Sequence, residues 1–122
     1  MATILVVDDE EVVRCVVRDM LEPEGHTVID TEDPQDALRL AREQPIHLLL
    51  TDMVMPQMRG TELASRVSGE SPSTRILLMS AYTMAEMAEA GRAFIGKPFT
   101  IRSLTDKVRQ LLDQPSALTA GA

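Results

Sequence analysis

The sequence predicts a single α/β domain, in which a parallel sheet of five strands is covered by helices on both faces. Three observations lead to this fold class. The chain has 122 residues, a length typical of one domain, and 44% of them are hydrophobic, which is enough for a core. Short apolar runs alternate along the chain with segments that have helical periodicity. Repeated alternation of this kind favours a doubly wound parallel sheet, because each crossover needs a helix on one face or the other.

The first half of the chain supplies three strands and two helices. The predicted strands are Thr3–Val7, His26–Asp30 and Ile46–Thr51, and the predicted helices are Glu10–Glu22 and a segment from Pro34 to about Glu43. The first strand is apolar at successive positions, as expected for a strand that is buried on both faces. In the first helix, apolar residues recur with helical spacing and form one face, which includes Val12, Cys15 and Val16. Asp33 is the predicted N-cap of the second helix, because it precedes a proline in the first turn.

The second half supplies two more strands and three helices. The predicted strands are Arg75–Met79 and Arg92–Ile95, and the predicted helices are Thr61–Ser68, a short fourth helix at Tyr82–Ala90 and a last helix that is capped by Thr100. Gly69 is expected to end the third helix. Met53–Arg59 contains a proline and ends at Gly60, so it is expected to be a loop. The predicted domain covers residues 1–113, and residues 114–122 form a loose C-terminal tail.

Composition and charge exclude several classes of function. The net charge is -7 and the isoelectric point is about 4.7, so a nucleic acid would be repelled and no direct nucleic-acid partner is expected. One cysteine, Cys15, cannot form an internal disulfide and is interpreted as a small buried hydrophobic residue. The apolar runs are too short to span a bilayer, and the N-terminus lacks the pattern of a signal peptide. A cytoplasmic protein without a membrane partner is therefore expected, and His26 and His47 are interpreted as structural.

Polar side chains follow the predicted strands at the points where the strands end. Asp8 and Asp9 follow the first strand and Asp52 the third, while Ser80 follows the fourth and Lys97 the fifth. Because the carboxyl ends of parallel strands lie at the same edge of a sheet, these side chains are expected to share one crevice. Two carboxylates about 4 Å apart repel by roughly 4 kcal/mol at an effective dielectric near 20, so the cluster needs a cation. Oxygen ligands with room for water favour Mg²⁺.

The same set of groups is suited to phosphoryl transfer. A carboxylate oxygen can attack phosphorus and form an acyl phosphate. A magnesium ion and a lysine can neutralise the phosphoryl oxygens, and a serine hydroxyl can donate a hydrogen bond to one of them. An alternative for Asp8 and Asp9 is that they only cap the following helix, and Ser80 and Lys97 taken singly are ordinary loop residues. The convergence of all of them favours the chemical role.

Four sequence motifs resemble the receiver domains of response regulators in two-component signalling. They are VVDDE, LLLTDMVMPQMRG, ILLMSAY and GKPF, and they occur in the family's order over nearly the whole chain. The resemblance implies a flavodoxin-like, chemotaxis-type domain with strand order 2-1-3-4-5. It also implies that Asp52 is the phosphoacceptor. Asp9, Asp52 and the backbone carbonyl of Val54 would hold the magnesium ion, and Asp8 would bind it mainly through water.

The resemblance also implies roles for residues of the fourth and fifth strand ends. Ser80 would donate a hydrogen bond to the phosphoryl group, and Lys97 would pair with another of its oxygens. The peptide bond before Pro98 would be cis. Phe94 occupies the position of the family's switch aromatic, with plain core packing as the alternative. Tyr82 lies either on a partner-binding face that changes with phosphorylation or on the ordinary surface.

The chain departs from the family in two places. Gln57 and Arg59 stand where a glycine and an acidic residue are usual, and a basic residue at 59 is hypothesised to alter partner choice or phosphoryl lifetime. Only sixteen residues separate Ser80 from Lys97, which is fewer than in most relatives. This shortening predicts a short fourth helix and an altered phosphorylation-dependent surface.

The function predicted from the sequence is a phosphorylation-dependent switch or phosphorelay receiver. A histidine kinase or histidine phosphotransfer protein would phosphorylate Asp52, and a downstream protein would read the result. The chain would be a monomer or weak dimer, and no enzyme beyond assisting its own phosphorylation and autodephosphorylation. The alternatives are a phosphorylation-independent docking module, or a receiver domain from a hybrid histidine kinase or larger regulator.

Two other functions fit the residues poorly. A flavin-binding protein of this fold would need a phosphate loop rich in glycine and hydroxyl groups after the first strand, where Asp8 and Asp9 would repel the phosphate. A hydrolase that works through an aspartyl phosphate would need two aspartates separated by one residue, and the chain has Val54 at that distance from Asp52.

Overall fold

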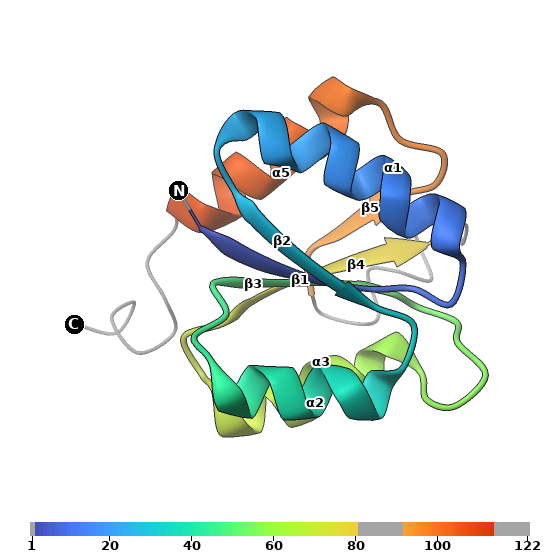
Figure 1. The fold of residues 1–122 in the computed structure, drawn as a ribbon, viewed down its shortest axis with the longest axis vertical. Coiled ribbons are helices and arrows are strands. Elements are labelled where there is room, and N and C mark those ends of the chain that lie inside the picture. The colour runs from blue at the N-terminus through green and yellow to red at the C-terminus, as the bar shows by residue number, and fades with distance from the viewer. Residues whose placement is uncertain (1, 81–91, 114–122) are drawn as a thin grey trace.

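Five parallel strands form one sheet in the computed structural model, which describes residues 2–80 and 92–113 (Figure 1). The strand order is β2-β1-β3-β4-β5, as the resemblance implied. The strands are β1 (Thr3–Val7), β2 (Thr27–Thr31), β3 (Leu48–Asp52), β4 (Arg75–Ser80) and β5 (Phe94–Gly96). The predicted α/β fold class is therefore confirmed. The short fourth helix predicted at Tyr82–Ala90 and the predicted tail lie outside the described residues.

Four α-helices in the described part of the chain cover the two faces of the sheet. They are α1 (Glu11–Leu21), α2 (Pro34–Glu43), α3 (Gly60–Glu70) and α5 (Ile101–Asp113), and a 3₁₀ turn at Glu22–Glu24 follows α1. Figure 1 shows α1 and α5 on one face and α2 and α3 on the other. Within the described residues, no helix is both long enough and apolar enough to span a bilayer.

Two separate cores lie between the sheet and its helices, one on each face. In β1, Ile4 and Val6 pack in the core with α1 and α5, whereas Leu5 and Val7 pack in the core with α2 and α3. The residues alternate because successive side chains of a strand point to opposite faces. All four are completely buried, which explains why the run is apolar at each position.

The helix starts follow the expected capping chemistry. The Asp33 carboxylate accepts the Gln35 N–H at 2.9 Å, and Pro34 occupies the first turn of α2 as predicted. The Thr100 hydroxyl accepts the Ser103 N–H at 3.0 Å, which caps α5 as predicted. The Ser103 hydroxyl in turn accepts the Thr100 N–H at 2.9 Å, so the two residues cap each other.

Several predicted boundaries are wrong by one or more residues. Strand β3 extends to Asp52 and β4 extends to Ser80, so both residues end their strands and do not follow them. Gly69 does not end α3, which continues to Glu70, because the Ser71 N–H still donates to the Val67 carbonyl at 2.7 Å. The helix therefore passes through Gly69 for one more residue.

The predicted burial of Cys15 is wrong, because this residue is exposed. The neighbouring Val12 is 73% exposed and Val16 is 40% exposed, whereas Val17 and Leu21 are completely buried. Since each residue advances about 100° around a helix, positions 12 and 16 lie beside the face that packs on the sheet. The apolar side of α1 is therefore wider than the face that the sheet covers.

Candidate functional site

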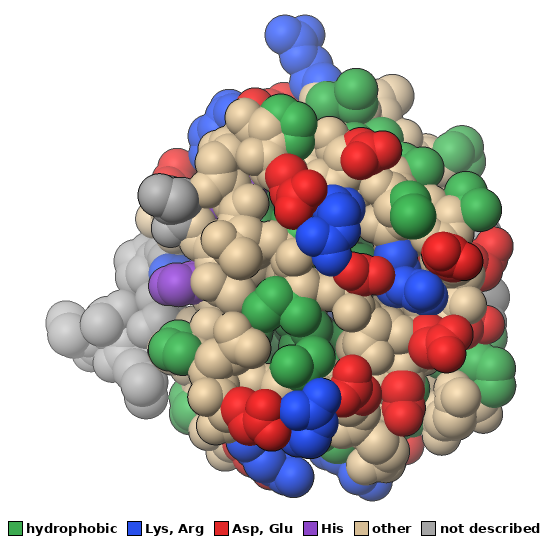
Figure 2. All heavy atoms as spheres, in the orientation of Figure 1, with side chains coloured by type: hydrophobic (Ala, Val, Ile, Leu, Met, Phe, Trp, Pro, Cys, Tyr) green, Lys and Arg blue, Asp and Glu red, His purple; other side chains and the backbone are tan. Residues whose placement is uncertain are grey.

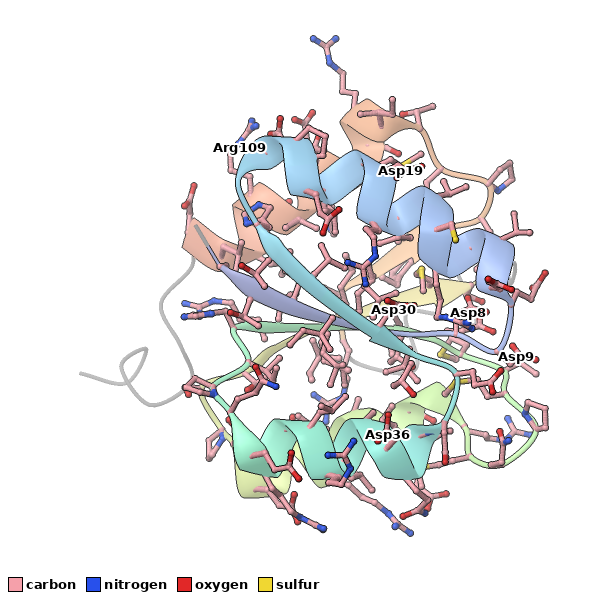
Figure 3. All side chains as sticks on the ribbon, viewed as in Figure 1. Asp8, Asp9, Asp19, Asp30, Asp36 and Arg109 are labelled. Carbon is pink, nitrogen blue, oxygen red and sulfur yellow. The ribbon has the colours of Figure 1, made fainter. Side chains whose placement is uncertain are left out.

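The ends of four strands meet at one edge of the sheet and form a cleft. Its lining includes Asp9, Asp52, Ser80 and Lys97, together with Glu10, Met53 and Val54. Figure 3 shows Asp8 and Asp9 at this edge, where β1 passes toward α1. The parallel topology thus brings together the residues that the sequence predicted at the strand ends.

Three carboxylates form the acidic part of the site. Asp8, Asp9 and Asp52 each offer an oxygen atom, and these atoms lie within 4.8 Å of one another. Asp8 is completely buried and Asp9 is exposed. One oxygen of Asp8 accepts the Glu10 N–H at 2.9 Å and the other accepts from Lys97. Asp9 and Asp52 are consequently better arranged than Asp8 to bind a cation directly.

Lys97 forms ion pairs with two of the three carboxylates. Its ammonium nitrogen lies 3.1 Å from Asp8 Oδ2 and 3.2 Å from Asp52 Oδ1. Burial lowers the pKa of Lys97, but hydrogen bonds and charges from Asp8 and Asp52 outweigh it and raise that pKa above its usual value. Lys97 therefore stays charged, and the three carboxylates and one ammonium leave two net negative charges, which match a divalent cation.

Asp52 has an environment that disfavours its charged form. Burial raises the pKa of Asp52, the Lys97 charge opposes this, and the charges of Asp8 and Asp9 raise the pKa further. The net result is a pKa above the ordinary value for aspartate. A cation at the cluster would reverse the effect of the two neighbouring carboxylates, and so would favour the ionised, nucleophilic form.

The loop that follows Asp52 is anchored in the core that lies between the sheet and helices α2 and α3. Met55 and Met58 are 6% and 7% exposed and pack in the core with α2 and α3. The Gly60 N–H donates to the Met53 carbonyl at 2.9 Å. A Cβ atom at Gly60 would lie only 2.1 Å from the Asp52 carbonyl oxygen, so this approach of α3 to β3 requires glycine. Sequence reasoning identified Gly60 only as the end of a loop.

The remaining predicted residues have different surroundings. Ser80 is 2% exposed, and its carbonyl accepts the Lys97 N–H at 2.8 Å. The Lys97–Pro98 peptide bond is cis, the isomer that the resemblance implied. Phe94 is partly buried against the core of α2 and α3. Val54 is 53% exposed and lines the cleft, whereas Tyr82 lies outside the described residues.

Sequence reasoning missed a contact between α1 and the acidic turn. Arg14 donates from Nη1 to the Asp8 carbonyl at 2.8 Å and from Nε to Asp30 Oδ2 at 2.9 Å. Arg14 and Asp30 are sixteen residues apart in the chain. A basic residue on a helix is usually interpreted as solvated. Only the position of Arg14 in the first turn of α1, close after the aspartate pair, could have suggested this contact.

Residues 4–109 match the response regulator receiver domain. The chain belongs to this family. Receiver domains are the phosphoacceptors of two-component signalling and are paired with histidine kinases. The chain is thus a receiver of phosphoryl groups, and a purely phosphorylation-independent docking module is not favoured.

Individual relatives have different lengths. The chain is 30% identical to the response regulator receiver protein CpdR of Brucella abortus, and the match covers 92% of this chain and 98% of CpdR. It is 35% identical to the DNA-binding transcriptional regulator NtrC of Azospirillum brasilense over 99% of this chain, but spans only 27% of NtrC. The chain likewise spans only 52% and 9% of the length of two other relatives.

A solved structure supports the comparison. The response regulator TrrA of Thermotoga maritima, in complex with Mg²⁺ and BeF, has a TM-score of 0.82 and 29% sequence identity. The match covers 91% of this chain and 99% of TrrA. The receiver fold is therefore shared over nearly all of both chains.

Proposed function

We propose that Asp52 accepts a phosphoryl group from a histidine kinase or a histidine phosphotransfer protein, with the help of Mg²⁺. The observation that carries this proposal is the cluster of Asp8, Asp9 and Asp52, with Lys97 bound to two of its members. The complex of the similar receiver TrrA with Mg²⁺ and BeF supports the choice of ion. Autodephosphorylation at the same residue completes the proposal.

The donor atoms of the site fit a magnesium ion. All of them are oxygen atoms, and two net negative charges stand at the cluster. Asp9 and Asp52 would hold the ion together with the Val54 carbonyl, and Asp8 would reach it through water, since both of its carboxylate oxygens already accept hydrogen bonds. When bound, the ion supplies charge neutralisation for the phosphoryl oxygens.

The transfer itself is a displacement at phosphorus. An Asp52 carboxylate oxygen attacks the phosphorus atom, the P–O bond forms, and the P–N bond to the donor histidine breaks with its electron pair returning to the imidazole nitrogen. The result is an acyl phosphate on Asp52. Lys97, which starts 3.2 Å from Asp52 Oδ1, then pairs with a phosphoryl oxygen, and Ser80 donates a hydrogen bond to another.

Exposed apolar residues of α1, of the loop after β3 and of the start of α5 offer a surface for the phosphoryl donor. These residues, named here the apolar rim, are Val12, Val16, Val54 and Ile101. The first two belong to α1, which packs beside α5, and Figure 2 shows apolar side chains among the charged ones over this side of the molecule. Apolar groups that border a polar site are typical of a protein–protein interface.

Phosphorylation is proposed to act on a downstream protein through Ser80 and Phe94, with Tyr82 as a further member of the switch. The added negative charge on Asp52 would draw Ser80 and Lys97 toward it and bias the surface around them. The cytoplasmic location, the lack of a nucleic-acid partner and the monomer or weak dimer remain predictions from the sequence.

The mass of the purified protein after incubation with acetyl phosphate and Mg²⁺ tests this proposal. We expect a gain of about 80 Da that is absent without Mg²⁺ and absent in Asp52→Asn. No gain with either acetyl phosphate or a panel of histidine kinases would refute the proposal. Val12→Asp and Ile101→Asp test the apolar rim, because they should slow transfer from a kinase and leave the reaction with acetyl phosphate unchanged.

A further inference from the structure

The carbonyl that Arg14 holds belongs to the peptide bond between Asp8 and Asp9. Strand β1 ends at Val7, but the Asp8 N–H still donates to the Thr31 carbonyl at 3.2 Å. With Arg14 Nη1 at 2.8 Å from its carbonyl, the backbone of Asp8 is fixed at both polar groups. Its carboxylate is fixed by the Glu10 N–H and Lys97 as well. The backbone that carries Asp9 is therefore held in place, although Asp9 itself is exposed.

Arg14 is in turn held by a partly buried ion pair under α1. Its Nε donates to Asp30 Oδ2, and its side chain is only 13% exposed. The other oxygen of Asp30 accepts from Arg18 Nη2. Figure 3 shows Asp8 and Asp30 near each other beneath α1. Burial raises the pKa of Asp30, but its hydrogen bonds to Arg18 and Arg14 outweigh this and lower the pKa, so Asp30 stays charged.

We infer that Arg14 is a positioning residue for the magnesium site. It touches neither the ion nor the phosphoryl group, but it fixes the peptide plane between Asp8 and Asp9. A fixed backbone lets the Asp9 carboxylate bind the ion with less loss of conformational freedom. This inference rests on the proposed function, since it requires that Asp9 and Asp52 bind Mg²⁺.

Charge alone predicts the opposite effect of removing Arg14. The loss of a positive charge near three carboxylates should strengthen the attraction for a cation and tighten Mg²⁺ binding. Loss of positioning should weaken the binding. The sign of the change in affinity therefore separates a positioning role from a general electrostatic one.

Arg18 provides a matched control on the same helix. It lies one turn after Arg14 and also bonds to Asp30, but among the described residues its side chain donates to Asp30 and Glu22, and not to Asp8. A substitution at Arg18 thus removes the same charge and disturbs the same aspartate without releasing the acidic turn.

The test is the dissociation constant for Mg²⁺, measured by isothermal titration calorimetry because the chain has no tryptophan to report binding. The proteins are wild type, Arg14→Met, Arg14→Lys and Arg18→Met, with circular dichroism to verify folding. We expect Arg14→Met to bind Mg²⁺ about tenfold more weakly than wild type, as is typical for partners that orient metal ligands. Arg18→Met should bind as tightly as wild type or more tightly. Arg14→Lys keeps one donor and should lose less affinity than Arg14→Met.

The outcomes separate this inference from the proposed function. If wild type binds Mg²⁺ and Arg14→Met binds as tightly as Arg18→Met, the positioning role is overturned and the magnesium site stands. If wild type itself does not bind Mg²⁺, both are overturned. If Arg14→Met does not fold, Arg14→Gln and Arg18→Gln are compared by the same criteria, because glutamine is neutral but tolerates partial exposure.

Discussion

Replacement of Gly60 with alanine tests how closely α3 approaches the end of β3. An added Cβ would lie 2.1 Å from the Asp52 carbonyl oxygen, whereas ordinary van der Waals contact begins at 3.4 Å. To restore ordinary contact, the backbone must therefore open by about 1.3 Å, from 2.1 to 3.4 Å. Overpacking of this kind costs about 1–3 kcal/mol, which outweighs the roughly 0.5–1 kcal/mol that alanine gains over glycine in a helix. We expect Gly60→Ala to lower the free energy of unfolding by about 2 kcal/mol.

Urea denaturation followed by circular dichroism measures this change, and phosphorylation by acetyl phosphate measures its effect on Asp52. Gly69→Ala is the matched control, because it lies in the last turn of the same helix and its Cβ would meet nothing within 4 Å. That variant should be equal to wild type or more stable by up to about 1 kcal/mol. The reasoning is refuted if Gly60→Ala and Gly69→Ala unfold at the same urea concentration, since the close approach would then have no energetic consequence.

Three further predictions concern charged groups. Lys97→Met removes the cation that pairs with the buried Asp8. The variant should lower the free energy of unfolding of the metal-free protein by about 2–3 kcal/mol, which is less than the roughly 3–5 kcal/mol typical of breaking a fully buried ion pair. Added Mg²⁺ should raise the thermal stability of this variant more than that of wild type. Burial lowers the pKa of His26 below its usual 6.5, so the unfolded chain binds a proton at higher pH than the folded one. Stability should therefore fall as the pH drops through about 6.5, and urea denaturation of His26→Gln should show a smaller fall. Arg59→Asp should tighten Mg²⁺ binding about twofold at low salt, with the effect lost at high salt, because Arg59 is exposed in the loop that follows Asp52. Equal affinity at low salt and equal dephosphorylation rates would refute a role for this charge.

The sequence could predict the chemistry of the site because that chemistry depends on strand ends. Asp52 and Lys97 were identifiable because each stands where an apolar run stops, and parallel topology brings such points to one edge whatever the details of packing. The same logic could not separate Asp8 from Asp9. They are neighbours in the chain, and only the tertiary structure shows that Asp8 is buried, with Glu10 and Lys97 as partners of its carboxylate, and that Asp9 is exposed.

Other features depend on which surfaces meet in three dimensions. The periodicity of α1 includes Val12, Cys15 and Val16 in one apolar face, but the sheet covers only the part that contains Val17 and Leu21. Local periodicity states which side of a helix is apolar and not how much of it a neighbour covers.

By itself, the sequence determined the α/β class, the alternation of strands and helices, and the carboxylates and lysine at the strand ends, since each follows from local pattern and parallel topology. Only the tertiary structure decided that Gly60 packs against the Asp52 carbonyl and that Arg14 reaches both Asp8 and Asp30. The physical reason is that these contacts join different elements, and their distances are set by the packing of helices on the sheet, which no local pattern encodes.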